Sequence, residues 1–402
     1  MGKLCKLKDN KISINVLYHG NIDYKNPSSV SAVVICAAKC LTKHGYDFAI
    51  YCDYQQPKSK NILPFEEQLC EGIRILRFNG IKYRRNKRLY NWAKIFWISK
   101  KSGNNEVLLN HIHVLPELVL TSRLFSKKIP NIFHVHSFPG SWQGKRWLFA
   151  LKYADKIIAV SSFIKEKLIE KYPFVEHKVT VLFNGVDTEL FNPQRKFDLK
   201  RKLGLAQNRF IVFFSGNIWK VKGFETVVKT AKELFHSERD IVFIIAGGFN
   251  PETNQLHRKW KEVSTPNMNF LGALNHGDLS RYYASANVTI VPSLWEEPFG
   301  MVIIESMSCG TPVIGSRIGG IPELIDDGIN GFLINPGSVK ELKEKIIWCK
   351  EHFKRLKEMG KKARKEALQF DWSIISDKLK TIYLSVSDKK VILATECNDK
   401  KV

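Results

Sequence analysis

The 402-residue sequence lacks three features that each mark a particular class of protein. No stretch approaches 18 consecutive apolar residues, so no membrane-spanning helix is predicted. The N-terminus, MGKLCKLKDN, has no apolar signal-peptide core, and Lys6 stands where a myristoylation signal needs Ser or Thr. The eight cysteines include no CxxC pair, which favours free thiols in a reducing compartment. We therefore expect a cytoplasmic protein.

Acidic residues are also few relative to basic ones. Lys and Arg number 63 against 39 for Asp and Glu, so the net charge is +24. A field of this sign attracts anions such as nucleic acid, acidic lipid headgroups or phosphorylated substrates. No recognisable nucleic-acid-binding module accompanies the charge, so we expect no nucleic-acid partner.

Short apolar runs alternate with helix-length amphipathic segments along almost the whole chain. This alternation is typical of parallel sheets covered on both faces by helices. Thirteen candidate strands are many for one sheet, so the predicted fold class is α/β with two doubly wound, Rossmann-like units. The candidate strands are 12–17, 48–51, 73–78, 107–109, 132–135, 157–160, 179–182, 210–214, 241–246, 268–271, 288–291, 312–315 and 332–334.

The connection between the two units is expected within 184–203, which holds Gly, Asn, Pro and charge without periodicity. We therefore predict an N-terminal domain over 1–190 and a C-terminal domain over 191–370. A last helical segment is expected over 371–388, followed by a loose tail over 389–402.

Most of the chemical information lies in 293–320, SLWEEPFGMVIIESMSCGTPVIGSRIGG. Glu297 and Pro298 precede an apolar helical run that begins near Met301, and Gly300 would let a ligand approach the backbone closely. A helix N-terminus presents free N–H groups to phosphate. Glu297 lies before this turn and Glu305 behind it, so the two carboxylates could hold hydroxyls on either side of a bound diphosphate. The alternative is that Glu297 is a solvated loop charge and Glu305 an ordinary helix residue.

The same segment resembles the signature of the retaining glycosyltransferases of family 4, also called group 1, which have the GT-B fold. Their two glutamates, written E-P-F-G and E-A-M-x-x-G-x-P-V, correspond to Glu297-Pro298-Phe299-Gly300 and to the stretch from Glu305 to Val313. Further similar segments follow the family order: 154–161, 181–187, 215–223, 319–323, 330–333 and 370–373. The resemblance implies two Rossmann-like domains facing a cleft, with the C-terminal helix crossing back to the first domain.

The resemblance also implies roles for individual residues of the C-terminal, donor-binding domain. Lys222 matches the lysine that pairs with the donor diphosphate, Glu297 the residue that binds hydroxyls of the donor sugar, and Glu305 the residue that binds the ribose. The remaining donor-side positions are Gly216, Asn217, Leu271, Phe299, Gly300 and Met301.

Two positions depart from the family pattern. Asn217 stands where an arginine usually follows the loop glycine, so one cation on the leaving phosphate is missing unless Lys220 substitutes for it. The paired glycines of the first loop, which in the family lie against the diphosphate and acceptor, are absent, and Gly20 alone remains there as a donor-binding residue.

Four histidines form two HxH pairs, His111/His113 and His134/His136. Alternate residues of a strand share a face, so each pair could bind a metal ion. No carboxylate or cysteine cluster completes either pair, and we expect no metal. By resemblance His136 lies near the donor sugar. We place His113, after the strand over 107–109, on the acceptor side, and His134 in the buried structure.

The segment from Arg74 to Lys101 contains ten basic residues, including Arg84 and Arg85, and no acidic one. It also contains the aromatic-rich run LYNWAKIFWI, a combination that suits an anionic bilayer surface. Arg84 and Arg85 are therefore assigned to the acceptor side. The alternative is a helix packed on the sheet beside a solvated basic loop.

The function that the resemblance implies is retaining transfer of a hexosyl or N-acetylhexosaminyl group from a nucleotide sugar, expected to be UDP-linked because most of the family uses UDP. The expected acceptor is a glycan or lipid-linked molecule of cell-envelope or lipopolysaccharide synthesis at the inner face of the cytoplasmic membrane, as in lipopolysaccharide-core hexosaminyltransferases. His136, Lys222 and Glu297 are the predicted catalytic residues, and no metal or permanently bound cofactor is expected. The alternative is a catalytically weak or inactive relative that serves as a coat or assembly protein.

Overall fold

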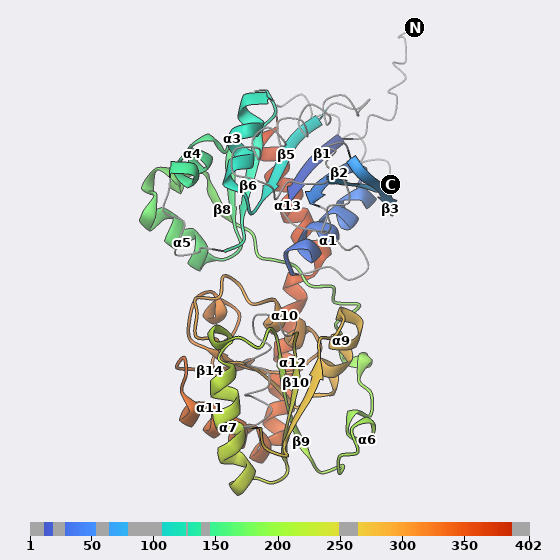
Figure 1. Ribbon diagram of the computed structural model, residues 1–402, viewed down its shortest axis with the longest axis vertical. Helices are drawn as coiled ribbons and strands as arrows, with labels where there is room; N and C mark the ends of the chain where they lie inside the picture. The colour runs from blue at the N-terminus through green and yellow to red at the C-terminus, as the bar shows by residue number, and fades with distance from the viewer. Residues whose placement is uncertain are drawn as a thin grey trace. The chain divides into compact units, whose positions relative to one another are not determined.

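The computed structural model describes residues 12–18, 29–53, 64–78, 107–125, 128–137, 145–248 and 264–387 (Figure 1). The chain forms two compact units, one of Met1–Phe183 with Ser373–Val402 and the other of Asn184–Trp372. Each unit is built on one mainly parallel sheet. The prediction of two doubly wound α/β units is therefore confirmed.

The first unit has an eight-stranded sheet among its described residues, with the order β3-β4-β2-β1-β5-β6-β7-β8. Its strands are β1 Ile12–Tyr18, β2 Tyr46–Asp53, β3 Pro64–Cys70, β4 Ile73–Phe78, β5 Val107–His113, β6 Asn131–Val135, β7 Lys156–Ala159 and β8 Val179–Val181. The helices are α1 Ser29–Lys43, α3 Pro116–Phe125, α4 Lys145–Tyr153, α5 Ser162–Lys171 and most of α13, Trp372–Val386.

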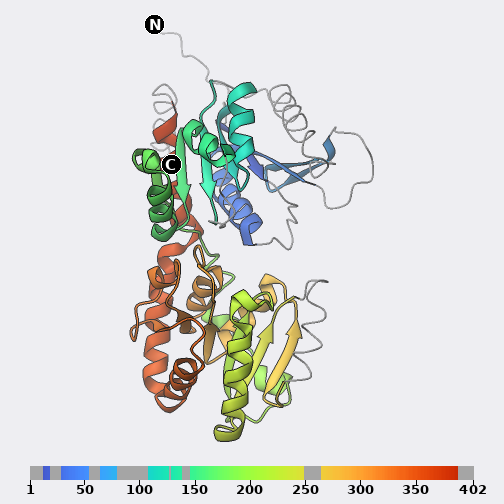
Figure 2. The ribbon, with the colours of Figure 1, turned by 60° about the vertical axis from the view of Figure 1, so that its left-hand side comes forward.

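Strand β3 was not predicted. It pairs antiparallel with β4 at the edge of an otherwise parallel sheet, and Figure 2 shows this two-stranded ribbon in blue. Its sequence, PFEEQLC, begins with proline and contains Glu66 and Glu67. Edge strands tolerate proline and charge because one side of the strand faces no partner. Strand β3 therefore lacks the continuous apolar run by which a buried strand is recognised in a sequence.

The second unit has a six-stranded parallel sheet in the order β11-β10-β9-β12-β13-β14. Its strands are β9 Phe210–Ser215, β10 Ile241–Ala246, β11 Met268–Gly272, β12 Val288–Val291, β13 Val313–Ser316 and β14 Gly331–Ile334. Its helices are α6 Leu199–Lys202, α7 Phe224–Ser237, α9 His276–Ser285, α10 Met301–Ser308, α11 Val339–Glu351 and α12 Phe353–Ala367. The strand order reverses between β9 and β12, and open parallel sheets bind ligands at such a point.

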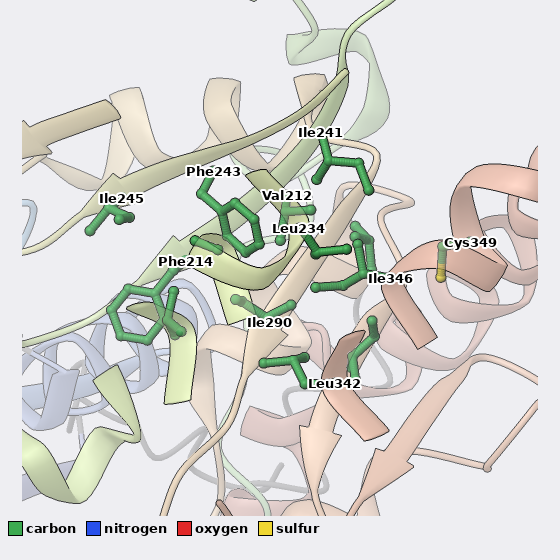
Figure 3. Close-up of a cluster of buried hydrophobic side chains, with 14 of the residues drawn as sticks. Val212, Phe214, Leu234, Ile241, Phe243, Ile245, Ile290, Leu342, Ile346 and Cys349 are labelled. Atoms are coloured by element: carbon green, nitrogen blue, oxygen red, sulfur yellow. The ribbon is translucent and has the colours of Figure 1, made fainter. Parts of the chain in front are cut away.

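Helices cover both faces of this second sheet. Phe214 of β9 packs against Phe224 of α7, while the neighbouring Phe213 packs against Tyr283 of α9. Figure 3 shows the core on the α7 side, which β9, β10, β12, α7 and α11 build together from fully or nearly fully buried side chains. A sheet buried on both faces requires strands that are apolar throughout, such as IVFIIA in β10.

The boundary between the units differs from the predicted one. The segment 184–190 belongs to the second unit rather than the first. Val186 exchanges backbone hydrogen bonds with Phe370 and Trp372, at 2.8 and 3.2 Å, and the Thr188 hydroxyl bonds Asp371. These contacts with the segment before α13 hold the connecting chain on the second unit. Helix α13 then contributes its residues from Ser373 onward to the first unit.

Cysteines and helix lengths also bear on the sequence predictions. The six cysteines within the described ranges are all free thiols. Among the helices of the described part of the chain, none is both long enough and apolar enough to cross a bilayer.

Candidate functional site

The loops that follow β9 and β12 meet at the point where the second sheet reverses its strand order. The first loop runs from Gly216 through the 3₁₀ turn Lys220–Lys222, and the second carries Ser293 to Gly300. A backbone hydrogen bond of 2.8 Å from Leu294 N to Val221 O fixes one loop against the other. Two loops from distant parts of the sequence therefore form one rigid edge.

Lys222 and Glu297 lie together on this edge. The Lys222 ammonium donates to Glu297 Oε1, and the Ser293 hydroxyl donates to the same oxygen at 2.9 Å. Lys222 Nζ also stands 5.0 Å from the centre of the Trp295 ring. The two residues that the sequence assigned to the donor diphosphate and the donor sugar are thus brought into direct contact.

Close backbone packing fixes the position of Glu297. Gly320 N donates to Glu297 O at 2.7 Å. Gly319 has φ of +61°, and a Cβ on it would lie 2.4 Å from Glu297 O and 2.6 Å from Glu297 N. Only glycine fits both this conformation and this spacing.

Glu305 is placed behind the N-terminus of α10. Gly300 precedes this helix with φ of +108° and offers no side-chain cap, so the first backbone N–H groups at Met301 face the edge without a capping oxygen. Glu305 is 6% exposed, and Tyr283 OH donates to its Oε2 at 3.3 Å. Burial raises the pKa of Glu305 to about 8, and the hydrogen bond from Tyr283 opposes this shift.

The other donor-side positions follow the same sheet edge. Gly216 comes directly after β9, and Leu271 lies near the end of β11. Asn217 is exposed, and so is Lys220, the residue considered as its substitute. Phe299 is buried and packs against Phe370, so its side chain is structural and only its backbone can serve a ligand.

Three residues of this site were missed from the sequence. Ser293 and Tyr283 bond the two glutamates, and the Trp295 ring covers the Lys222 ammonium. Trp295 Nε1 is buried and has no hydrogen-bond partner within the described residues. Ser293 and Trp295 lie inside the motif segment, but no spacing rule indicated what their side chains contact.

In the first unit, the two histidine pairs form one cluster. His111 Nε2 lies 3.2 Å from His134 Nδ1, and His113 Nδ1 lies 2.8 Å from His136 Nε2. The predicted strand ended at residue 109, whereas β5 continues to His113. His111 and His113 therefore lie within the strand rather than beyond it. Burial is the main cause that lowers the pKa of all four, to about 3 for His111 and His136. His134 is buried, as predicted.

The remaining predicted positions fall partly outside the described residues. Gly20, Arg84 and Arg85 lie there. Two members of the basic segment are described, and both belong to β4 rather than to an exposed surface. Arg74 pairs with Asp47 at 3.6 Å, and Arg77 is buried.

Comparison with protein families agrees with this geometry. Residues 195–366 match the family described as "Glycosyl transferases group 1", and residues 30–190 match "Glycosyltransferase Family 4". Together the two matches account for most of both units.

Individual relatives are similar at modest identity. Alpha-maltose-1-phosphate synthase of Mycobacterium tuberculosis is 30% identical over 288 residues, which are 64% of this chain and 73% of that protein. Spore coat protein SA of Bacillus subtilis is 27% identical over 246 residues, 57% of this chain and 64% of the coat protein, less than two thirds of its length. Among solved structures, Anabaena HepE in complex with UDP-glucose superposes with a TM-score of 0.74 at 21% identity, covering 93% of this chain and all of that one. At that identity the superposition shows the shared GT-B fold.

Proposed function

Because this chain belongs to the group 1 glycosyltransferases, we propose that it is a retaining transferase that moves a sugar from a UDP-linked donor to a glycan or lipid-linked acceptor. The sugar is a hexose or an N-acetylhexosamine. The observation that carries the proposal is the Lys222–Glu297 pair at the reversal point of the second sheet.

Donor binding uses the groups that are already fixed on this edge. The diphosphate takes Lys222 as its counterion and receives N–H groups at the N-terminus of α10, where the helix dipole favours negative charge. Glu297, released from Lys222, accepts hydrogen bonds from hydroxyls of the sugar. Glu305 takes the ribose hydroxyls, and Leu271 lies toward the base. HepE supplies the reason for choosing UDP, since its solved complex contains UDP-glucose.

The transfer step is electrostatic rather than nucleophilic. As the bond from the sugar to the phosphate breaks, negative charge develops on the phosphate, and Lys222 with the α10 N–H groups stabilises it. The departing phosphate oxygen takes the proton of the acceptor hydroxyl, which attacks from the same face, so the anomeric configuration is retained. Glu297 keeps the hydrogen bond from Ser293 after Lys222 turns to the phosphate, which supports a binding role instead of that of a covalent nucleophile. No metal ion takes part in this step.

The first unit serves the acceptor. His136 contacts the donor sugar and His113 the acceptor side. The part of the basic segment that follows β4, with Arg84 and Arg85, binds an anionic membrane surface, so the enzyme works at the inner face of the cytoplasmic membrane on cell-envelope or lipopolysaccharide precursors. The net charge of +24 supports this placement.

The test is donor binding and hydrolysis across UDP-, GDP- and ADP-sugars, with the anomeric configuration of any product determined by NMR. We expect one donor to bind, and Glu305→Ala to abolish the binding. Glu344→Ala, which removes an exposed carboxylate from α11, is the matched control and should bind as the wild type does. An inverted product would reject the retaining mechanism while leaving donor use intact.

A coat or assembly protein is the second candidate. Asn217 in place of the usual arginine and the similarity to spore coat protein SA favour it. The same panel separates the two functions, because an assembly protein would bind none of the donors.

A further inference from the structure

The four histidines at the ends of β5 and β6 form one group, whereas the sequence showed only two separate HxH pairs. In the parallel register of the two strands, His113 stands directly beside His134. His111 and His113 share one sheet face, as do His134 and His136. The ring centres of His113 and His134 are 5.0 Å apart, so imidazoles from both strands face a common centre.

One nitrogen of the cluster is left unsatisfied. His134 Nε2 is buried and has no hydrogen-bond partner among the residues that the structure describes. The side chain as a whole is only 3% exposed. Leaving such a group unpaired costs about 1–3 kcal/mol, so the free nitrogen indicates a ligand.

The spacing of the ring nitrogens suits a transition metal ion. His111, His113 and His134 each offer one nitrogen, and these three atoms lie within 4.8 Å of one another. Two nitrogens bound tetrahedrally to Zn²⁺ at about 2.0–2.1 Å lie about 3.3–3.4 Å apart. His134 Nδ1 lies 3.2 Å from His111 Nε2. The free Nε2 of the same His134 ring is the ligand atom, so that ring must turn and exchange this hydrogen bond for the ion.

Partners around the three histidines orient them in the manner of an outer coordination shell. Tyr383 OH from α13 bonds His111 Nδ1 at 2.7 Å, which directs Nε2 of that ring into the cluster. His136 Nε2 bonds His113 Nδ1 at 2.8 Å, which leaves His113 Nε2 to bind the ion. Metal-binding histidines are oriented in this way by a hydrogen bond at the other ring nitrogen.

We propose that His111, His113 and His134 bind one Zn²⁺ ion inside the first unit, with Tyr383 and His136 as positioning residues. Imidazole nitrogens suit zinc, copper and nickel better than magnesium or calcium. The proposed transfer step does not use this ion, but the site shares His113 and His136 with the roles proposed for the acceptor and the donor sugar, so its test measures metal binding rather than turnover.

Cobalt provides a direct test, because tetrahedral Co²⁺ absorbs visible light strongly whereas octahedral Co²⁺ absorbs weakly. The full chain is stripped with EDTA, dialysed and titrated with Co²⁺ and then with Zn²⁺. We expect an intense visible band that saturates at one equivalent and disappears as Zn²⁺ displaces Co²⁺. A weak band without saturation, or no band, would overturn the proposal and leave a metal-free network of histidine hydrogen bonds.

Variants identify the ligands. His134→Gln and His111→Asn should each lose the band, whereas His177→Gln, which alters an exposed histidine of the same unit, should keep it. Tyr383→Phe should fold and bind Zn²⁺ about 10–100-fold more weakly, as expected for loss of an orienting hydrogen bond. If the two ligand variants do not fold, the band and stoichiometry of the wild type with the Zn²⁺ affinity of Tyr383→Phe decide the question. Unchanged Zn²⁺ affinity in Tyr383→Phe would contradict the assigned geometry.

Discussion

The Lys222 ammonium and the Glu297 carboxylate form an ion pair between the loops that follow two neighbouring strands, β9 and β12. Their side chains are 27% and 11% exposed, so the pair is partly shielded from water. The partners are 75 residues apart in the sequence. A diphosphate that binds here competes with Glu297 for Lys222, so donor binding exchanges one counterion for another.

Lys222→Ala should lower turnover by about 10²–10³-fold, the loss typical when one preorganised donor to a developing negative charge is removed. The physical reason is that Lys222 is the cation held beside Glu297, whereas the exposed residue after the loop glycine, Asn217, is uncharged. The measurement is the steady-state rate at which the nucleoside diphosphate is released from the nucleotide sugar that binds in the donor panel.

The control is Lys229→Ala, which breaks an ion pair with Glu225 in which both side chains are largely exposed, at 61% and 41%. Exposed pairs of this kind contribute little to stability, so this variant should turn over as the wild type does. Near-wild-type turnover in Lys222→Ala would remove the lysine from the mechanism.

Burial of Glu305 predicts a specific pH dependence of stability. Its pKa rises from 4.5 to about 8 in the folded chain. A carboxyl group whose folded pKa is raised contributes stability that is complete below the unfolded pKa of 4.5. This contribution is lost as the pH rises toward 8, because the unfolded chain releases the proton first. Glu305→Gln keeps the size and neutrality of the protonated acid at every pH.

The stability of wild type relative to Glu305→Gln should therefore be highest below pH 4.5 and fall as the pH rises to about 8. Urea unfolding at several pH values measures this difference, and the other titrating groups cancel between the two proteins. Glu344→Gln, at an exposed site on α11, should show no such trend. A difference from wild type that is constant with pH would mean that Glu305 is already ionised in the folded chain.

Much of the fold was predictable because both sheets are parallel and buried. Such strands are apolar throughout, as FIVFFS in β9 shows, and they stand out from the sequence. Strand β3 did not, because a strand at the sheet edge can carry Pro64 and Glu66. The boundary near 190 was misplaced for a different reason. It depends on Val186 and Thr188 pairing with the chain around Asp371, a contact between segments that local composition cannot reveal.

The candidate site, like the fold, was predictable only in part. The motif located Glu297, Glu305 and Lys222 because their spacing is a property of the sequence. It could not indicate that Tyr283 would bond Glu305, since α9 and α10 are separate helices that only the folded packing brings together. Nor could it show that Tyr383 of the last helix would bond His111. Side chains that act from another element leave no local signature.

Reversing the charge at Arg84, Arg85, Lys87 and Arg88 should greatly reduce co-sedimentation with liposomes that contain anionic lipid. Each basic residue near such a surface contributes about 1 kcal/mol to binding, and the contribution is screened by salt. The matched control reverses four exposed basic residues of α12, Lys354, Arg355, Lys362 and Lys365, so the net charge changes equally. Equal loss in both variants would assign the attraction to net charge rather than to the basic segment.

Replacing Gly319 by alanine should impair catalysis through the backbone of Glu297. Gly319 and Gly328 both have positive φ, +61° and +78°, so alanine costs about 1–2 kcal/mol of backbone strain at either place. A Cβ at Gly328 meets nothing within 4 Å, whereas one at Gly319 would lie 2.4 Å from Glu297 O. Gly319→Ala must therefore shift Glu297, and a displacement of about 1 Å lowers turnover by about 10²-fold. Gly328→Ala should lose stability in urea unfolding but keep its turnover. Equal turnover in the two variants would show that the position of Glu297 does not depend on the close approach of Gly319.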